Sequence, residues 1–362
     1  MKKNILFFLP VFIYGGAGSA ITRMCKKFDK SKYNFYIISI GPCSYKNQLK
    51  KYVKKFYELK TTRAIYSIFE IRKIINQLNQ QNNAIFVSNI HYANIITILA
   101  LRNYSNLKII LVERTALEEL NIYFNLKDFI KKKIIKLLIK FYYKSANKII
   151  TNSKKASNDL KILSNSNVKT IYSPAFEKFV KKIKKNNFPK RILSVGRLSR
   201  EKGYDTLIKA INLINNKSFI LEIVGEGDQR KKLTKLIEQN KLKDQIFLRG
   251  HKKDPSKYFK KADLYINCSL FEGFPNSVVE AISYNIPVIC SRSHGGINEI
   301  LLNGKGGHFF KSGNSLELAN LISKFLKEEK KFQKKTKEAK NNISKYNINS
   351  CVREYQKIFE NL

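Results

Sequence analysis

Residues 271–281 constrain this chain more than any other stretch, because they join an expected strand to an expected helix through an acidic loop. Before them, residues 262–268 are a short apolar run rich in β-branched and aromatic side chains, which is typical of a buried strand. After the loop, residues 278–282 have a helical pattern, and Pro287 opens a further apolar run. The order strand, loop, helix, strand predicts an α/β fold with a parallel sheet.

Two acids occupy defined places in this unit. Glu272 lies in the loop at the carboxyl end of the strand, and Glu280 lies about one turn into the helix. Ligands of open α/β sheets bind at the carboxyl ends of the strands, and a helix amino terminus there suits a phosphate or a ribose. We therefore expect Glu280 to bind vicinal ribose hydroxyls and Glu272 to meet a sugar. The alternative is that Glu280 is a solvated helix residue and Glu272 a loop charge.

The surrounding residues carry a family resemblance. The segment Ser269-Leu-Phe-Glu-Gly-Phe-Pro, the seven residues between Glu272 and Glu280, and the later run Ile286-Pro-Val-Ile resemble the E-x7-E motif of glycosyltransferase family 4. Residues 291–300 resemble the next segment of that family. The resemblance implies a retaining, nucleotide-sugar-dependent enzyme of GT-B fold, with two Rossmann-like, doubly wound parallel-sheet domains facing a central cleft. It covers most of the second half of the chain and little of the first.

A second motif follows the strand expected at residues 191–195. Gly196 and Arg197 open a loop that ends at Lys202, and it resembles the family element G-R-x(3–4)-K-G. Two cations on one strand-to-helix loop can converge on a pyrophosphate and stabilise the charge that builds up on a leaving nucleoside diphosphate. The predicted catalytic residues are thus Arg197, Lys202 and Glu272. The resemblance adds further donor-binding positions, namely Gly196, Gly225, Gly273, Asn276, Ser277, Val278 and Glu280.

The first half contributes weaker candidates. Residues 5–12 fit a first strand, followed by Gly15 and Gly16 in a turn that opens a helix at about residue 20; a signal peptide is the alternative for this segment. The turn resembles the family's G-G-A loop, which implies a place near the donor phosphates and the acceptor. His91 follows the strand expected at 84–88, and Arg114 occupies the place where many family members carry a histidine. Both are assigned to the acceptor side.

Net charge points to an anionic partner. The 362 residues carry 69 basic and 27 acidic side chains, a formal charge of +42. From Lys131 to Lys148 the pattern predicts a helix with apolar residues on one broad stripe and lysines beside it. This helix either packs on the core with a solvated lysine face or lies on an anionic membrane leaflet. Five scattered cysteines without a Cys-x-x-Cys pair indicate a reducing cytosol.

Composition shifts divide the chain. We predict an acceptor-binding domain over residues 1–172, a linker over 173–189 and a nucleotide-sugar-binding domain over 190–345. The resemblance implies that the last helix, within 346–362, crosses back to the first domain.

These features predict a cytoplasmic enzyme at the inner face of the plasma membrane. It would transfer a hexose or N-acetylhexosamine from a nucleotide diphosphate-sugar, expected to be UDP-linked, with retention. The acceptor would be a glycan or polyprenyl-linked glycan of bacterial surface polysaccharide (lipopolysaccharide, capsule or O-antigen). The chain has no D-x-D triplet, so we expect no metal and no cofactor, and no nucleic-acid motif is present. A nucleotide-sugar epimerase of the same fold and a non-catalytic polyanion-binding protein remain the alternatives.

Overall fold

The computed structural model describes residues 2–61, 64–78, 83–123, 125–180, 188–216, 218–293 and 295–362. The chain divides into two compact units. Unit 1 comprises Met1–Pro174 together with Ile348–Leu362, and unit 2 comprises Ala175–Asn347. Part of the predicted linker, residues 181–187, lies outside the described residues.

Unit 1 contains a seven-stranded parallel sheet with the strand order β3-β2-β1-β4-β5-β6-β7. The order reverses between β1 and β4, so the loops after these two strands leave the sheet at its topological switch point. The strands are β1 (Lys3–Phe8), β2 (Tyr33–Ile40), β3 (Val53–Leu59), β4 (Ala84–Asn89), β5 (Lys108–Glu113), β6 (Lys148–Thr151) and β7 (Val168–Thr170).

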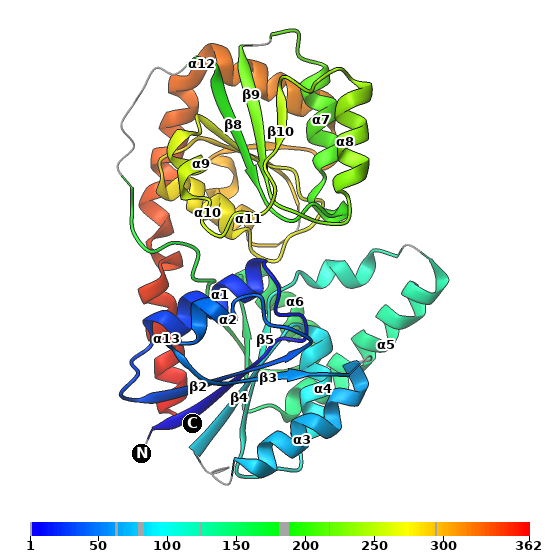
Figure 1. Cartoon of the computed structure of the whole chain (residues 1–362), viewed down its shortest axis with the longest axis vertical. Helices are drawn as coiled ribbons and strands as arrows, with labels where there is room; N and C mark the ends of the chain where they lie inside the picture. Colours follow the sequence, from blue (N-terminus) through cyan, green and yellow to red (C-terminus); the bar gives the residue numbers. More distant parts are fainter. Residues whose placement is uncertain are drawn as a thin grey trace. The chain divides into compact units, whose positions relative to one another are not determined.

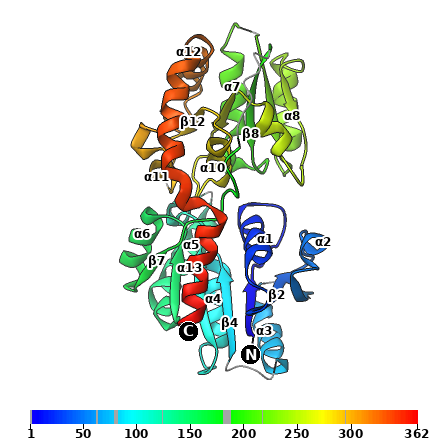
Figure 2. The ribbon, with the colours of Figure 1, turned by 90° about the vertical axis from the view of Figure 1, so that its left-hand side faces the viewer.

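Helices cover both faces of this sheet (Figure 1). Ile5 and Phe7 of β1 face one core cluster and Leu6 and Phe8 face another, which explains why the strand is apolar without alternation. The first cluster contains α1 and the carboxyl-terminal helix α13, which lie beside each other in Figure 2. The helices are α1 (Gly16–Lys27), α2 (Lys46–Leu49), α3 (Ser67–Gln77), α4 (His91–Leu101), α5 (Leu126–Tyr142), α6 (Lys154–Ser164) and α13 (Ile348–Glu360).

Unit 2 repeats this architecture with six parallel strands in the order β10-β9-β8-β11-β12-β13. The order reverses between β8 and β11, which places the loops after these strands next to each other. The strands are β8 (Lys190–Val195), β9 (Phe219–Val224), β10 (Ile246–Leu248), β11 (Leu264–Asn267), β12 (Val288–Ser291) and β13 (His308–Phe310). The helices are α7 (Tyr204–Asn212), α8 (Arg230–Gln239), α9 (Ser256–Lys261), α10 (Asn276–Ser283), α11 (Ile297–Ile300) and α12 (Ser315–Asn342).

The predicted α/β class, with two Rossmann-like parallel-sheet units, is therefore confirmed. The predicted boundaries of three elements were wrong. The first strand ends at Phe8 rather than residue 12, and α1 begins at Gly16 rather than near residue 20. The helix predicted from Lys131 to Lys148 is α5, which ends at Tyr142. It stops because a 3-10 turn follows and Asn147 then accepts the Ile109 N–H in the sheet.

Two further observations concern the chain as a whole. All five cysteines are buried and free. Within the described ranges, no helix combines the length and the apolar character that crossing a bilayer requires.

Candidate active site

The two loops that carry the strongest sequence motifs meet at the carboxyl edge of the unit 2 sheet. One loop runs from Gly196 to Gly203 after β8, and the other follows β11. The Leu270 N–H donates to the Glu201 carbonyl oxygen across a distance of 2.8 Å, which ties the loops together. This backbone bond fixes the loops relative to each other before any side chain is considered.

Lys202 and Glu272 form the centre of this edge. Lys202 Nζ donates to Glu272 Oε2 at 2.5 Å, and Ser269 Oγ donates to the same oxygen at 2.8 Å. The two charged side chains are 21% and 16% exposed, so the pair is shielded but still reachable from solvent. The sequence assigned Lys202 to a phosphate and Glu272 to a sugar, whereas here each neutralises the other. A bound anion would compete with Glu272 for the ammonium group.

Arg197 comes from the same loop as Lys202. Its side chain is exposed, and among the described residues it has no hydrogen-bond or ion-pair partner. Gly196 leaves room for the Tyr204 hydroxyl, because a Cβ at Gly196 would lie 2.9 Å from it, whereas Lys202 Cδ would be at an ordinary contact distance of 3.7 Å. Arg197 therefore offers an uncommitted guanidinium next to a lysine that is already positioned.

The amino end of α10 borders the same edge. Ser277 Oγ accepts a hydrogen bond of 2.7 Å from the Tyr265 hydroxyl, which anchors the first turn to β11. Asn276 Oδ1 is buried and lacks a hydrogen-bond partner among the described residues. Val278 is fully buried, so it holds the helix in place. Glu280 lies one turn further on and is partly exposed.

Glycines allow backbones to approach closely around this cluster. A Cβ at Gly225 would lie 1.8 Å from the Gly196 carbonyl oxygen, so only glycine fits there. Gly295 has a φ of +110°, and a Cβ there would lie 1.7 Å from the Glu272 carbonyl oxygen. The Gly296 N–H donates to the Gly273 carbonyl oxygen at 3.0 Å. The loop after β12 thus packs against the backbone of the loop that carries Glu272 and supports it.

Sequence reasoning missed Ser269, Tyr265 and Gly295 as parts of this site. Ser269 lay inside the quoted motif, and Gly295 inside the segment that follows it, so both had a signal. Tyr265 had none, because its role depends on the register between β11 and the neighbouring strand β8.

The candidates of unit 1 also lie at the carboxyl edge of their sheet. The Gly15 N–H points to the Tyr45 hydroxyl at 3.4 Å, so a tyrosine from beyond β2 closes the glycine turn. Gly16 is the first residue of α1. The turn therefore presents the amino terminus of a 12-residue helix at the switch point.

His91 is buried rather than open to solvent, with 2% of its surface exposed. Its Nδ1 donates to Thr115 Oγ1 at 3.2 Å, and that hydroxyl donates to Glu113 Oε1 at 2.7 Å. Nδ1 itself lies 3.7 Å from Glu113 Oε1. Tyr143 donates to the other carboxylate oxygen at 3.2 Å. His91 Nε2 is buried without a partner among the described residues.

His91 and Glu113 each shift the pKa of the other. Burial lowers the pKa of His91, but the Glu113 carboxylate raises it more, so the pKa lies above the ordinary 6.5. Burial raises the pKa of Glu113, but His91 and the Thr115 hydrogen bonds lower it more, so the pKa lies below 4.5. The two groups therefore stabilise each other as an ion pair.

Arg114 is held beside this pair. Its Nε donates to Asn89 Oδ1 at 2.7 Å, and Asn152 Nδ2 donates to its carbonyl oxygen at 3.0 Å. One guanidinium nitrogen, Nη2, is buried without a partner among the described residues. In the part of the chain that the structure describes, Arg114 is therefore held by amides and forms no ion pair with an acid.

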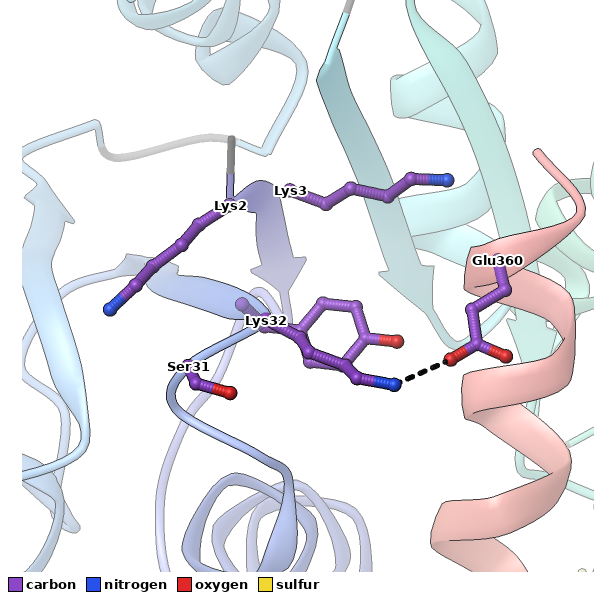
Figure 3. Close-up of a pocket in the computed structure, with 6 residues that line it drawn as sticks. Lys2, Lys3, Ser31, Lys32 and Glu360 are labelled. Atoms are coloured by element: carbon purple, nitrogen blue, oxygen red, sulfur yellow. Dashed lines mark hydrogen bonds and ion pairs between the residues drawn. The ribbon is translucent and has the colours of Figure 1, made fainter.

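A shallow hollow of about 460 Å³ lies elsewhere in unit 1 (Figure 3). It is lined by Lys2, Lys3, Ser31, Lys32, Tyr33 and Glu360, with Lys32 and Glu360 paired at 3.3 Å. Five of these residues lie at the amino ends of β1 and β2, and Glu360 ends α13, so the hollow is on the opposite edge of the sheet from Gly15 and His91.

Two parallel sheets and the cluster from Arg197 to Glu280 can now be compared with known proteins. Residues 175–343, which include the whole Arg197–Glu280 cluster, match the family described as "Glycosyl transferases group 1". Anabaena HepE in complex with UDP and glucose superposes with a TM-score of 0.81 at 19% identity, covering 99% of this chain and 100% of that one. The likeness shows the GT-B fold.

Three of the relatives found by sequence are named as glycosyltransferases. A Campylobacter jejuni N-acetylgalactosaminyltransferase acting on a diphospho-undecaprenol-linked sugar is 25% identical over 75% of this chain and 74% of its own length. An uncharacterized glycosyltransferase of Methanocaldococcus jannaschii is 32% identical over 48% of this chain. The poly(glycerol-phosphate) alpha-glucosyltransferase of Bacillus subtilis is 32% identical over 42%. The last two alignments span only 47% and 23% of those relatives.

Proposed function

We propose that this protein transfers a hexose or N-acetylhexosamine from a nucleotide diphosphate-sugar to a glycan or lipid-linked glycan, with retention at the anomeric carbon. The observation that carries the proposal is the cluster of Lys202, Glu272 and Ser269 beside the free Arg197, at the switch point of unit 2. Such an edge is where a doubly wound sheet binds nucleotides.

Each residue has a distinct part in the proposed reaction. Arg197 and Lys202 bind the diphosphate and stabilise the charge on it as the bond to the sugar breaks. As Lys202 turns to the diphosphate, Glu272 is released to accept hydrogen bonds from the sugar hydroxyls and to face the positive charge that develops on the ring. Glu280 accepts from the ribose hydroxyls. In unit 1, the Gly15–Gly16 turn, His91 and Arg114 form the acceptor side.

The names of the similar proteins support the choice of substrates. HepE is described in complex with UDP, with UDP and glucose, and with UDP-glucose. The Campylobacter relative is named for an acceptor on undecaprenyl diphosphate. Another relative, from Erwinia amylovora, is named "Amylovoran biosynthesis glycosyltransferase AmsK". These names support our proposal that the chain acts in bacterial surface-polysaccharide assembly with a UDP-linked donor.

The test begins with a thermal-shift screen against nucleotide sugars, followed by transfer assays with the donor that binds. Lys202→Ala is expected to lower kcat/KM by about 10²- to 10³-fold, because it removes a cation aimed at the leaving group. Lys243→Ala is the matched control, since Lys243 forms a comparable pair with Glu238 at 3.1 Å on the exposed surface. It should leave the rate unchanged.

Two additional arms separate the alternatives. Transfer should persist in a chelator, because Arg197 and Lys202 would stabilise the diphosphate without a metal ion. The product should keep the anomeric configuration of the donor. An epimerised sugar formed from donor alone would identify an epimerase instead. Full activity in both Lys202→Ala and Glu272→Gln would refute the site, and the absence of any nucleotide-sugar binding would refute the function.

A further inference from the structure

An unpartnered apolar stripe runs along α5, the helix that projects from the side of unit 1 in Figure 1. Six of its apolar side chains are between 39% and 72% exposed. They are Leu126, Phe129, Ile130, Ile134, Leu137 and Phe141. Leu126, Ile130, Ile134, Leu137 and Phe141 are spaced by three or four residues and lie on one side of the helix over its whole length, and Phe129 lies at the edge of this stripe.

Packing against the unit does not account for this stripe. The helix is attached to the core by Ile135 and Ile139, which are 5% and 0% exposed, and by the half-buried Leu138. With about 100° of rotation per residue, the exposed stripe lies on the side opposite to these buried residues. The single broad stripe predicted from the sequence is therefore two stripes, of which one has no partner in the described structure.

Lysines border the exposed stripe on both sides. Lys127 and Lys131 flank it along one edge, and Lys133 and Lys140 along the other, and all four are exposed. The only acid of α5, Asp128, is paired with Lys132 at 3.0 Å, so the exposed charges beside the stripe are those of lysines. At the amino end, Tyr123 and Phe129 form an edge-to-face pair with ring centroids 4.9 Å apart.

The apolar stripe and the lysines beside it together indicate which kind of partner would bind this face of α5. A second copy of the chain would bring its own lysines against these, and like charges at an interface oppose association. A bilayer with anionic head groups matches both features, because acyl chains receive the apolar stripe while lysines reach the head groups. Aromatic residues at the boundary also suit the membrane–water interface.

We infer that the exposed face of α5 docks on an anionic membrane surface, with the six apolar side chains at the boundary between head groups and acyl chains. The lysines on both sides hold the helix parallel to that surface. The inference stands on the side chains of α5 and not on the proposed reaction. Unit 1 would thereby be held at the leaflet from which a lipid-linked acceptor is reached.

The test is co-sedimentation of the full chain with vesicles. The protein should sediment with vesicles of phosphatidylcholine and phosphatidylglycerol, and not with phosphatidylcholine alone. Ile130→Gln/Ile134→Gln/Leu137→Gln should weaken this binding at least tenfold, since glutamine keeps the helix but removes the apolar contact. Leu213→Gln/Leu316→Gln is the matched control, because these leucines are 51% and 61% exposed on unit 2.

Charge is tested separately. Lys131→Gln/Lys133→Gln/Lys140→Gln should weaken binding by about 10²-fold, as each of the three lysines near an anionic leaflet strengthens it about fivefold. The control is Lys231→Gln/Lys232→Gln/Lys235→Gln on α8, where the three lysines are likewise exposed. Binding by the wild-type chain should fall as salt is added.

Insertion has a direct spectroscopic readout, because the chain contains no tryptophan. In a Leu137→Trp variant, the emission should shift to shorter wavelength with anionic vesicles and be quenched by brominated acyl chains. If the triple Gln variant of the stripe sedimented with vesicles as strongly as the wild-type chain, the inference would be overturned. An emission shift that depends on protein concentration, and not on vesicles, would overturn it too, and would assign the stripe to a second copy.

Discussion

The buried ion pair of His91 and Glu113 links the stability of unit 1 to pH. The pKa of His91 is raised in the folded state, so its contribution is complete below 6.5 and is lost as pH rises through the folded value. The pKa of Glu113 is lowered, so its contribution is complete above 4.5 and is lost as pH falls through the folded value. Both contributions are complete together only between pH 4.5 and pH 6.5.

Replacing His91 by glutamine should therefore destabilise the protein in a pH-dependent way. Near pH 6 the cost is expected to be about 3 kcal/mol, because the variant leaves the Glu113 carboxylate buried without its charged partner. The cost should become smaller as pH rises through the raised pKa of His91, because the wild-type imidazole then loses its charge. Denaturant unfolding of both proteins across this range measures the difference.

Glu113→Gln provides the control for that measurement. It removes the charge that raises the pKa of His91, so it should flatten the same part of the pH profile. The double variant His91→Gln/Glu113→Gln should lose the part of the pH dependence of the unfolding free energy that comes from this pair, because neither titrating group remains. A cost of His91→Gln that stays constant from pH 6 to about pH 9 would contradict the ion pair.

Backbone strain marks the same region. Ile90 has a φ of 71°, which is rare for a β-branched residue, and it lies between β4 and His91. Its N–H donates to the Val112 carbonyl oxygen at 2.9 Å, and its own carbonyl oxygen accepts from Asn94. These bonds hold the strained residue, and they turn His91 toward Glu113 instead of toward solvent.

At the scale of elements, close contact between loops makes particular glycines indispensable. Gly225→Ala is expected to destabilise unit 2 by about 3 kcal/mol, because the new methyl group would overlap the Gly196 carbonyl oxygen. Donor binding should weaken as well, since the displaced loop carries Arg197 and Lys202. Thermal unfolding and donor titration measure the two effects.

Gly313→Ala is the comparison for this variant. Gly313 has a φ of +81° but no atom within 4 Å of its Cβ position. Its replacement should cost only the backbone strain of about 1 kcal/mol and leave donor binding intact. Equal costs for the two substitutions would mean that the contact at Gly225 does not hold the loop.

The elements that the sequence predicted well have strong local patterns. The strand before Glu272 and the helix that carries Glu280 were predicted, because apolar runs and Pro287 mark their ends. β3 was not predicted, since its sequence Val-Lys-Lys-Phe-Tyr-Glu-Leu is polar for a strand and lies at the sheet edge. The two stripes of α5 were merged, because periodicity shows which residues are apolar but not which of them are covered.

The candidate site shows the same division. The spacing of Glu272 and Glu280 and the pair Arg197 and Lys202 were visible in the sequence, as was their common edge of a sheet. The contact between Lys202 and Glu272 was not, because it depends on the conformations of two loops 70 residues apart. The burial of His91 was also missed, since Glu113 and Thr115 come from a different strand and loop.

At the scale of the whole molecule, the last helix belongs to the core of the first unit. Six residues of α13 are buried in the same cluster as β1, β2 and α1. They are Ile348, Cys351, Val352, Tyr355, Ile358 and Phe359. The cluster is thus assembled from the two ends of the chain, while the core of unit 2 draws only on residues between them. Unit 1 is therefore complete only after the residues of unit 2, because α13 follows unit 2 in the sequence.

This organisation predicts that one substitution weakens one unit selectively. Phe359 is fully buried against Phe28 and Tyr33, with ring centroids 5.6 and 5.7 Å away. Phe359→Ala should cost unit 1 about 3–5 kcal/mol through the cavity that it leaves. Amide hydrogen exchange should then accelerate in β1 and β2 but not in β8 and β11, because each unit has its own core.

Phe325→Ala is the reciprocal variant, since Phe325 is equally buried in unit 2 beside Phe332, with ring centroids 5.4 Å apart. It should accelerate exchange in β8 and β11 and spare β1 and β2. Selective responses would mean that the carboxyl-terminal helix stabilises the unit that begins the chain independently of the unit it follows. If either variant accelerated exchange equally in all four strands, the two cores would be a single cooperative unit, and the division at Pro174 and Ile348 would have no energetic meaning.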